Sequence, residues 1–196
     1  MEDNFKAIVK IPYKISVPTT YATASEVATL TFLRSKGFPV PKVYGWSSTR
    51  ENKVGVEYII MEHAPGVGAD TCWFQTTKHQ KKALVTGIVD IEKKLFDIPF
   101  ASIGSLYFKQ DIPPHLQGQL YQPGTPDEAK DSETYCIGPI ADYMFWYGQR
   151  AELELDRGPC ILILELVSDT LLLIILSRER PKTISSSNCQ QRNQVD

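Results

Sequence analysis

The sequence has few of the patterns that indicate metal or redox chemistry. It contains four cysteines, none of them in a Cys-x-x-Cys pair: Cys72, Cys136, Cys160 and Cys189. Its three histidines stand apart from one another, and no His/Cys group has the spacing of a zinc site. Because no secretory signal is recognisable, we expect free thiols in a reducing compartment. These patterns predict no metal site.

The common catalytic motifs are absent too. The chain contains no Gly-x-Ser-x-Gly, His-Glu-x-x-His, P-loop or Gly-x-Gly-x-x-Gly motif. Gly66-Val67-Gly68 is too short to indicate a phosphate-binding loop. We expect each histidine to be a surface or otherwise satisfied side chain. The motifs therefore predict no catalytic residue.

Positive charge is not in excess. The chain has 21 Lys and Arg against 23 Asp and Glu, and its net charge is −2. This balance predicts neither nucleic acid nor an anionic membrane as a partner, although one or two cations suffice for a local phosphate site. Residues 1–4 are acidic and resemble neither a secretory signal nor a transit peptide, so the sequence by itself predicts a cytoplasmic protein.

The sequence does contain a succession of short apolar segments, enough for one domain with a sizeable core. The predicted strands are Phe5–Ile11, Lys42–Ser47, Val54–Met61 and Ser102–Phe108, and the predicted helices are Tyr21–Lys36, Thr76–Phe96 and Ile140–Leu155. The first strand is apolar and β-branched, so we expect it to be buried, and Pro12 ends it. Asp111–Asp131 is rich in Pro, Gly and Gln and is predicted to be a loop.

Thr76–Phe96 is the clearest helix in the sequence. Leu84, Ile88, Ile91 and Leu95 recur at 4-3-4 spacing, with lysines elsewhere on the helix. We predict that these four side chains are buried.

Residues 160–196 have a different character from the rest. Cys160–Leu176 is rich in Leu and Ile but has no clean period. Glu165 and Asp169 argue against a membrane span, because a mid-membrane acid costs about 2.5–3.5 kcal/mol. Ser177–Asp196 is polar and predicted to be disordered. This tail is expected to pack poorly.

A lysine and a glutamate are the strongest candidates for a binding site. Lys10 follows three apolar residues in a predicted strand, and Glu26 lies sixteen residues later in the following predicted helix. A carboxylate that holds a lysine presents its ammonium group to phosphates in one geometry. Two plainer explanations stay open: Lys10 as an edge lysine that reaches water, and Glu26 as an acid favoured by the helix dipole.

The predicted strand that ends at Met61 runs into Glu62, His63 and Ala64, followed by Pro and Gly. An adenine ring needs backbone N–H and C=O groups in an extended segment with apolar walls. Met61–Ala64 is therefore a candidate adenine-binding segment, and this role is compatible with an ordinary core strand before it.

Several of these segments together resemble a known family. They are Ala7–Lys10, Tyr21–Leu30, Val40–Trp46 and Tyr58–Glu62. From about Phe5 to Pro159 the chain resembles the aminoglycoside phosphotransferase group of kinase-like proteins. The likeness is greatest to its fungal branch, which includes the altered-inheritance-of-mitochondria phosphotransferase-like proteins.

The resemblance implies an α+β fold class: a protein-kinase-like N-terminal lobe, made of an antiparallel sheet plus a helix, over residues 1–64, and a partial helical C-terminal lobe over residues 65–159. It implies that Lys10 contacts the ATP phosphates and that Glu26 is its partner, within about 4 Å. It also implies that Met61–Ala64 contacts adenine, and that the protein is mitochondrial.

The chain also departs from that family. The family's glycine loop precedes the lysine strand, but only six residues precede Ala7. The His-Gly-Asp catalytic segment and the later metal-binding Asp do not occur. We therefore expect a truncated chain that binds ATP weakly or not at all, has no Mg²⁺ ligands and transfers no phosphate. The alternatives are a pseudokinase-like module that binds a nucleotide or a partner, and a kinase completed by another chain.

Overall fold

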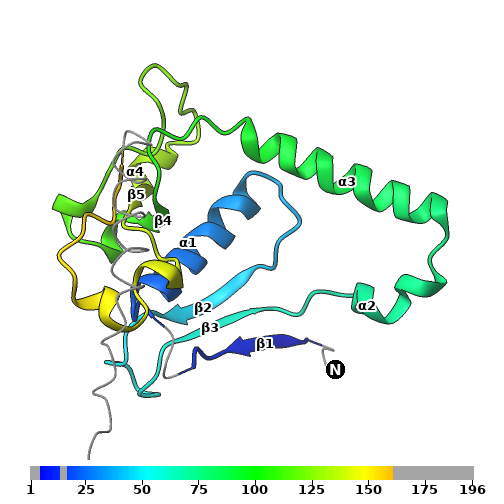
Figure 1. Cartoon of the computed structure of the whole chain (residues 1–196), viewed down its shortest axis with the longest axis horizontal. Coiled ribbons are helices and arrows are strands. Elements are labelled where there is room, and N and C mark those ends of the chain that lie inside the picture. The colour runs from blue at the N-terminus through cyan, green and yellow to red at the C-terminus, as the bar shows by residue number, and fades with distance from the viewer. Residues whose placement is uncertain (1–4, 14–16, 161–196) are drawn as a thin grey trace, which may run out of the picture.

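The computed structural model in Figure 1 describes residues 5–13 and 17–160. Its larger sheet has three antiparallel strands in the order β1-β3-β2: β1 (Ala7–Lys10), β2 (Val43–Ser47) and β3 (Tyr58–Glu62). In the ladder of β1 and β3, Ala7 lies opposite Glu62 and Lys10 opposite Ile59. The predictions made for the tail beyond Cys160 lie outside the described residues.

Helix α1 (Tyr21–Ser35) lies between this sheet and a two-stranded antiparallel ribbon of β4 (Ser105–Phe108) and β5 (Tyr135–Gly138) (Figure 1). The main core joins all three layers: Val27, Ala28, Phe32, Ile59, Leu106, Phe108, Leu120, Tyr135 and Ile137. The helix ends at Ser35, one residue before the predicted end at Lys36, and Gly37 follows with a φ of 77°, the left-handed conformation that glycine adopts without strain.

All four predicted strands are present but begin later than expected, β1 at Ala7 rather than Phe5. β3 begins at Tyr58, because the residues before it form a turn around Asn52, whose side-chain oxygen accepts hydrogen bonds from the backbone N–H groups of Val54 and Gly55. β2 begins at Val43 and β4 at Ser105. β5, the partner of β4, was not predicted.

The prediction that the first strand is buried is wrong. β1 pairs only with β3 among the described residues, so it is an edge strand. Ile8, Val9 and Ile11 are 44%, 57% and 56% exposed. An apolar run of this kind is typical of a strand covered on both faces, and here no described element covers the second face or the outer edge.

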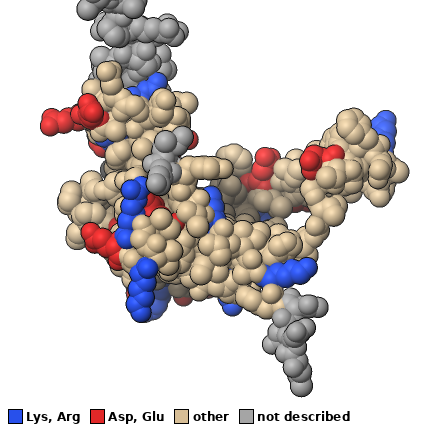
Figure 2. Space-filling view, turned by 90° about the horizontal axis from the view of Figure 1, so that it is seen from below, with Lys and Arg blue, Asp and Glu red and all other residues tan. Residues whose placement is uncertain are grey.

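The predicted burial of one face of the long helix is also wrong. After α2 (Ala69–Cys72) and a 3₁₀ turn (Trp73–Gln75), α3 (Lys78–Phe96) forms almost as predicted, with a capping box between Thr77 and Gln80. However, the four predicted core residues are all exposed: Leu84 46%, Ile88 47%, Ile91 40% and Leu95 43%. α3 stands away from the rest of the described chain (Figures 1 and 2), so its apolar face has no neighbouring element there.

The third predicted helix does not form. Ile140–Leu155 contains two 3₁₀ turns, Tyr143–Phe145 and Gly148–Glu152. The backbone of Gly148 has a φ of 61°, which interrupts any right-handed helix through it. The aromatic side chains do pack: the Trp146 indole N–H donates to the Ile140 carbonyl, and the Arg157 guanidinium lies 4.2 Å from the centre of its ring.

The connection from β4 to β5 is mostly loop, as predicted. It contains two 3₁₀ turns and one short helix: Lys109–Asp111, Pro114–Leu116 and α4 (Asp131–Thr134). α4 precedes β5 directly and brings Asp131 against the end of α1.

Candidate functional site

Lys10 and Glu26 form an ion pair between β1 and α1. The Lys10 Nζ atom lies 2.7 Å from Oε1 and 2.6 Å from Oε2 of Glu26. The two side chains are 49% and 35% exposed. The predicted separation of about 4 Å or less is therefore confirmed.

The plainer explanations of these two residues fare differently. The explanation of Lys10 as an edge lysine that reaches water agrees with the structure, because β1 is an edge strand among the described residues and the Lys10 side chain is 49% exposed. The dipole explanation of Glu26 is weak, because the first turn of α1 contains no acid and the dipole effect falls off within that turn. The position of Glu26 is better explained by its contact with Lys10.

The predicted adenine-binding segment lies further along the sheet. Met61 packs against the main core, while His63 and Ala64 are exposed. Glu62 accepts hydrogen bonds from the Arg34 guanidinium and from the backbone N–H of Lys42, both at 3.0 Å. The segment is thus half core and half surface.

A cleft of 660 Å³ opens beside this segment, lined by Phe5, Lys6, Tyr44, Glu62, His63, Pro65 and Gly66. Lys10 and Glu26 are not among the lining residues. Because Ala7 pairs with Glu62, Lys10 lies three residue pairs, or about 10 Å, from the cleft end of β1. The structure joins the predicted lysine and glutamate, but neither of them lines the cleft beside the predicted adenine segment.

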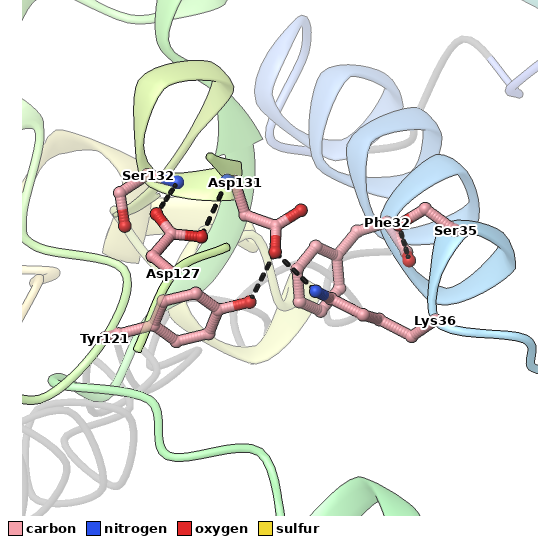
Figure 3. A network of polar contacts seen from close by, with 7 residues as sticks. All are labelled: Phe32, Ser35, Lys36, Tyr121, Asp127, Asp131 and Ser132. Atoms are coloured by element: carbon pink, nitrogen blue, oxygen red, sulfur yellow. Dashed lines mark hydrogen bonds and ion pairs between the residues drawn. The ribbon is translucent and has the colours of Figure 1, made fainter. Parts of the chain in front are cut away.

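A polar network at the C-terminal end of α1 was not predicted (Figure 3). The buried carboxylate of Asp131 forms an ion pair with the Lys36 ammonium and accepts a hydrogen bond of 2.9 Å from the Tyr121 hydroxyl. Asp127 accepts from the backbone N–H groups of Asp131 and Ser132, at 2.8 and 2.9 Å. These contacts join α1 to the loop between β4 and β5.

The pKa values of this network reflect its partial burial. Burial acts to lower the pKa of Lys36, but its hydrogen bond to Asp131 and its other contacts raise the pKa above the usual value. Burial, and then the hydrogen bond to Asp131, raise the pKa of Tyr121 to about 12. The backbone N–H of Ser132 lowers the pKa of Asp127. The folded state therefore favours a charged lysine and a neutral tyrosine here.

A second buried carboxylate lies at the other end of α1. Glu57, the residue before β3, is 8% exposed and accepts hydrogen bonds from the Thr23 hydroxyl at 2.7 Å and the Thr20 backbone N–H at 3.3 Å. It lines a pocket of 330 Å³ with Tyr13 and Arg50, among others. An acid inside an apolar predicted strand was the only sequence signal for it.

Other features of the described residues bear on the kind of site. They include no group of three or more His, Cys, Asp and Glu side chains that could hold a metal ion. None of their helices is long and apolar enough to cross a membrane. Positive and negative side chains are interspersed on the face that Figure 2 shows. Cys72 and Cys136 are free thiols, as expected, and burial raises the pKa of Cys136 to about 11.

The chain is similar to several fungal proteins. It is 40% identical over 156 residues to a subtelomeric hrmA-associated cluster protein of Aspergillus fumigatus, a match that covers 79% of this chain and 28% of that protein. It is 34% identical over 147 residues to the altered inheritance of mitochondria protein 9, mitochondrial, of Candida tropicalis, covering 70% of this chain and 24% of that protein. The protein of the same name from Yarrowia lipolytica is 29% identical over 171 residues, covering 81% and 29%.

These matches confirm the predicted similarity to fungal altered-inheritance-of-mitochondria proteins. The chain spans only about a quarter of the length of these relatives. No protein-family model matches the chain. No solved structure matches it either. The kinase-like assignment thus stays a prediction, and the words "inheritance of mitochondria" describe the relatives only.

Proposed function

We propose that this chain is part of a kinase-like ATP-binding protein and carries its phosphate-contacting lysine. Lys10 would contact the phosphates, Glu26 would hold Lys10 in place, and Met61–Ala64 would contact adenine. The observation that carries the proposal is the Lys10–Glu26 ion pair, in which both ammonium–carboxylate distances are below 2.8 Å. In protein kinases a strand lysine and a helix glutamate pair in the same way.

The arrangement of the sheet supports this proposal. The glycine-rich loop of a kinase covers the phosphates and precedes the lysine strand. The outer edge of β1 has no partner strand among residues 5–13 and 17–160, so its backbone groups are available to a preceding hairpin. Lys10 lies at the end of this edge strand, with a side chain that is still half exposed.

Phosphate transfer by this chain alone is not part of the proposal. Transfer to a hydroxyl needs a group that positions the acceptor and metal ions that neutralise the phosphates. The sequence contains no His-Gly-Asp segment, and the described residues contain no cluster that could hold Mg²⁺. Transfer from ATP to a small-molecule hydroxyl is proposed only for the longer relatives, with groups outside the quarter of their length that this chain matches.

A mitochondrial location is proposed from the names of several relatives, which include the word mitochondrial. Fractionation of cells that express the tagged full-length protein tests it. Recovery of the protein in the cytosol alone would contradict the proposal.

The alternative function is a pseudokinase-like module that binds a nucleotide or a protein partner. The exposed apolar face of α3 favours the partner, because contiguous exposed apolar side chains often mark interaction surfaces. Binding of ATP without turnover is expected from the first candidate and from a nucleotide-binding module, but not from a module that binds only a protein partner.

Titration calorimetry with ATP, with and without Mg²⁺, tests the proposal. We expect weak binding by the full chain and an affinity at least about tenfold lower for Lys10→Met, because a charge-assisted contact to phosphate is lost. Lys53→Met, at an exposed lysine before β3, is the matched control and should bind like the unchanged chain. Equal affinity of Lys10→Met would contradict the proposal. Turnover of ATP that depends on Lys10 would overturn the expectation that this chain is inactive.

A further inference from the structure

Two carboxylate residues are buried in the described part of the chain, and both hold α1. Glu57 is 8% exposed and Asp131 is 6% exposed. Glu57 contacts the N-terminal end of the helix, and Asp131 contacts the residue that follows its C-terminal end. Neither residue belongs to α1. A buried carboxylate costs free energy unless it is hydrogen-bonded, and the contacts with α1 offset this cost for both residues.

The contact at the N-terminal end lies one turn from Glu26. The Thr23 hydroxyl, which donates to Glu57, is three residues before Glu26 and therefore on nearly the same side of the helix. Thr20, the N-cap residue, has a φ of 69° and receives no cap from its own side chain. This conformation is uncommon for a non-glycine residue, and the backbone N–H of Thr20 donates to Glu57 at 3.3 Å.

The contact at the C-terminal end fixes the other end of the helix. Lys36 pairs with Asp131, and its ammonium lies 5.4 Å from the centre of the Phe32 ring and 6.0 Å from that of Tyr121. Asp131 is itself held by the Tyr121 hydroxyl. Figure 3 shows these side chains converging between α1 and the β4–β5 loop. α1 is therefore attached at both ends to different parts of the fold.

The Lys10–Glu26 pair does not hold α1 in position by itself. Both side chains are at least a third exposed, and ion pairs of this kind contribute little to stability. The position of Glu26 must come from the packing of α1 and from its two ends. We propose that Glu57 and Asp131 are positioning residues, which fix α1 so that Glu26 stays in contact with Lys10. The role of these two carboxylates in ligand binding rests on the proposed function, but their contacts with the two ends of α1 do not.

The test measures the release of Lys10 in the full chain. Sulfo-NHS-acetate acetylates free lysine ammonium groups through their neutral form, and mass spectrometry reports the rate at each lysine. The Glu26→Gln variant gives the reference rate of acetylation for a Lys10 that has lost its carboxylate partner. Glu57→Ala and Asp131→Asn should each raise the rate at Lys10 toward that value, by roughly 1.5- to 5-fold, the range that loss of a surface ion pair allows.

Three further variants separate positioning from general destabilisation. Glu57→Gln keeps an acceptor for the Thr20 N–H and should restore part of the protection. Glu51→Gln, at an exposed acid in the same hairpin, should leave the rate unchanged. Glu133→Gln should also leave the rate unchanged. Glu133 is an exposed acid two residues from Asp131, and among the described residues it forms an ion pair only with Lys130. Circular dichroism at the labelling temperature confirms that each variant is folded.

Unchanged Lys10 labelling in folded Glu57→Ala, Glu57→Gln and Asp131→Asn would overturn the proposal, even if their melting temperatures fell. Calorimetry with ATP provides the independent second measurement. If the unchanged chain binds no ATP, the proposed function fails, and the labelling rates still decide whether the two carboxylates position α1. If it binds ATP, the same variants should weaken binding while Glu133→Gln does not.

Discussion

The two long helices of this chain differ in an instructive way. The 15-residue α1 carries several buried side chains, among them Ala24, Val27 and Ala28, each 0% exposed. The 19-residue α3 contains no buried residue, although its apolar residues follow the clearest helical period in the sequence. Periodicity thus identifies the apolar face of a helix, while the presence of neighbouring elements decides whether that face is buried.

The neighbours of α1 come from distant parts of the sequence. The sheet covers it from one side and the β4–β5 ribbon from the other. Fully buried alanines let these layers approach the helix closely, and Phe32 packs against Phe100 and Tyr135, with ring centres 5.8 and 5.3 Å away. α3 has its own capping box but no comparable contacts among the described residues.

The largest expected effect tests this contrast directly. Phe32→Ala should lower the free energy of unfolding by about 3–5 kcal/mol, because it leaves a cavity between the layers. Ile88→Ala on α3 should change it by less than about 0.5 kcal/mol, as at other exposed positions. Urea unfolding followed by circular dichroism measures both. A comparable loss in Ile88→Ala would show that the apolar face of α3 is covered in solution and would break the comparison.

The next effect concerns alkaline pH and the network at the end of α1. The folded-state pKa values of Lys36 and Tyr121 are raised, the latter to about 12. In the unfolded chain these groups lose their protons first, so their contribution to stability is complete below pH ~10 and falls as the pH rises toward ~12. Tyr121→Phe should lower the unfolding free energy by about 1 kcal/mol at pH 8 and reduce its further fall at high pH.

Tyr13→Phe, at a tyrosine that is 83% exposed, is the control for this titration. It should leave both the stability at pH 8 and the alkaline slope unchanged. An equal slope in Tyr121→Phe and in the unchanged chain would show that the network does not carry the alkaline sensitivity.

Much of the local structure could be predicted from the sequence, because its causes are local. α1 forms within one residue of its predicted bounds, and Lys10 lies on a strand with Glu26 on the helix after it. The resemblance to a family supplied the prediction that these two side chains meet. Glu57 and Asp131 could not be found in this way, because their roles depend on contacts 34 and 95 residues apart.

The wrong predictions have a related cause. Ile140–Leu155 contains side chains that suit a helix, but Gly148 and the bond from Trp146 to the Ile140 carbonyl give a tighter, irregular path. β1 and α3 are apolar enough to be buried, yet no described element covers them. A sequence pattern states what a segment can bury, and the tertiary structure determines what it does bury.

The smallest expected effect on global stability comes from the cap of α3. The Thr77 hydroxyl accepts from the backbone N–H of Gln80, and the Gln80 side chain accepts from the Thr77 N–H. Thr77→Ala removes the hydrogen bond from the Gln80 N–H to the Thr77 hydroxyl. Loss of such an N-cap destabilises a helix by about 0.5–2 kcal/mol. Because α3 has no buried residue, we expect faster amide hydrogen exchange in its first two turns and no change in the melting temperature of the core.

Thr86→Ala, in the middle of the same helix, is the control. It should slow exchange slightly, since alanine has the higher helix propensity. If Thr77→Ala instead lowered the melting temperature of the whole domain, α3 would be coupled to the core, and the contrast between the two helices would have to be given up.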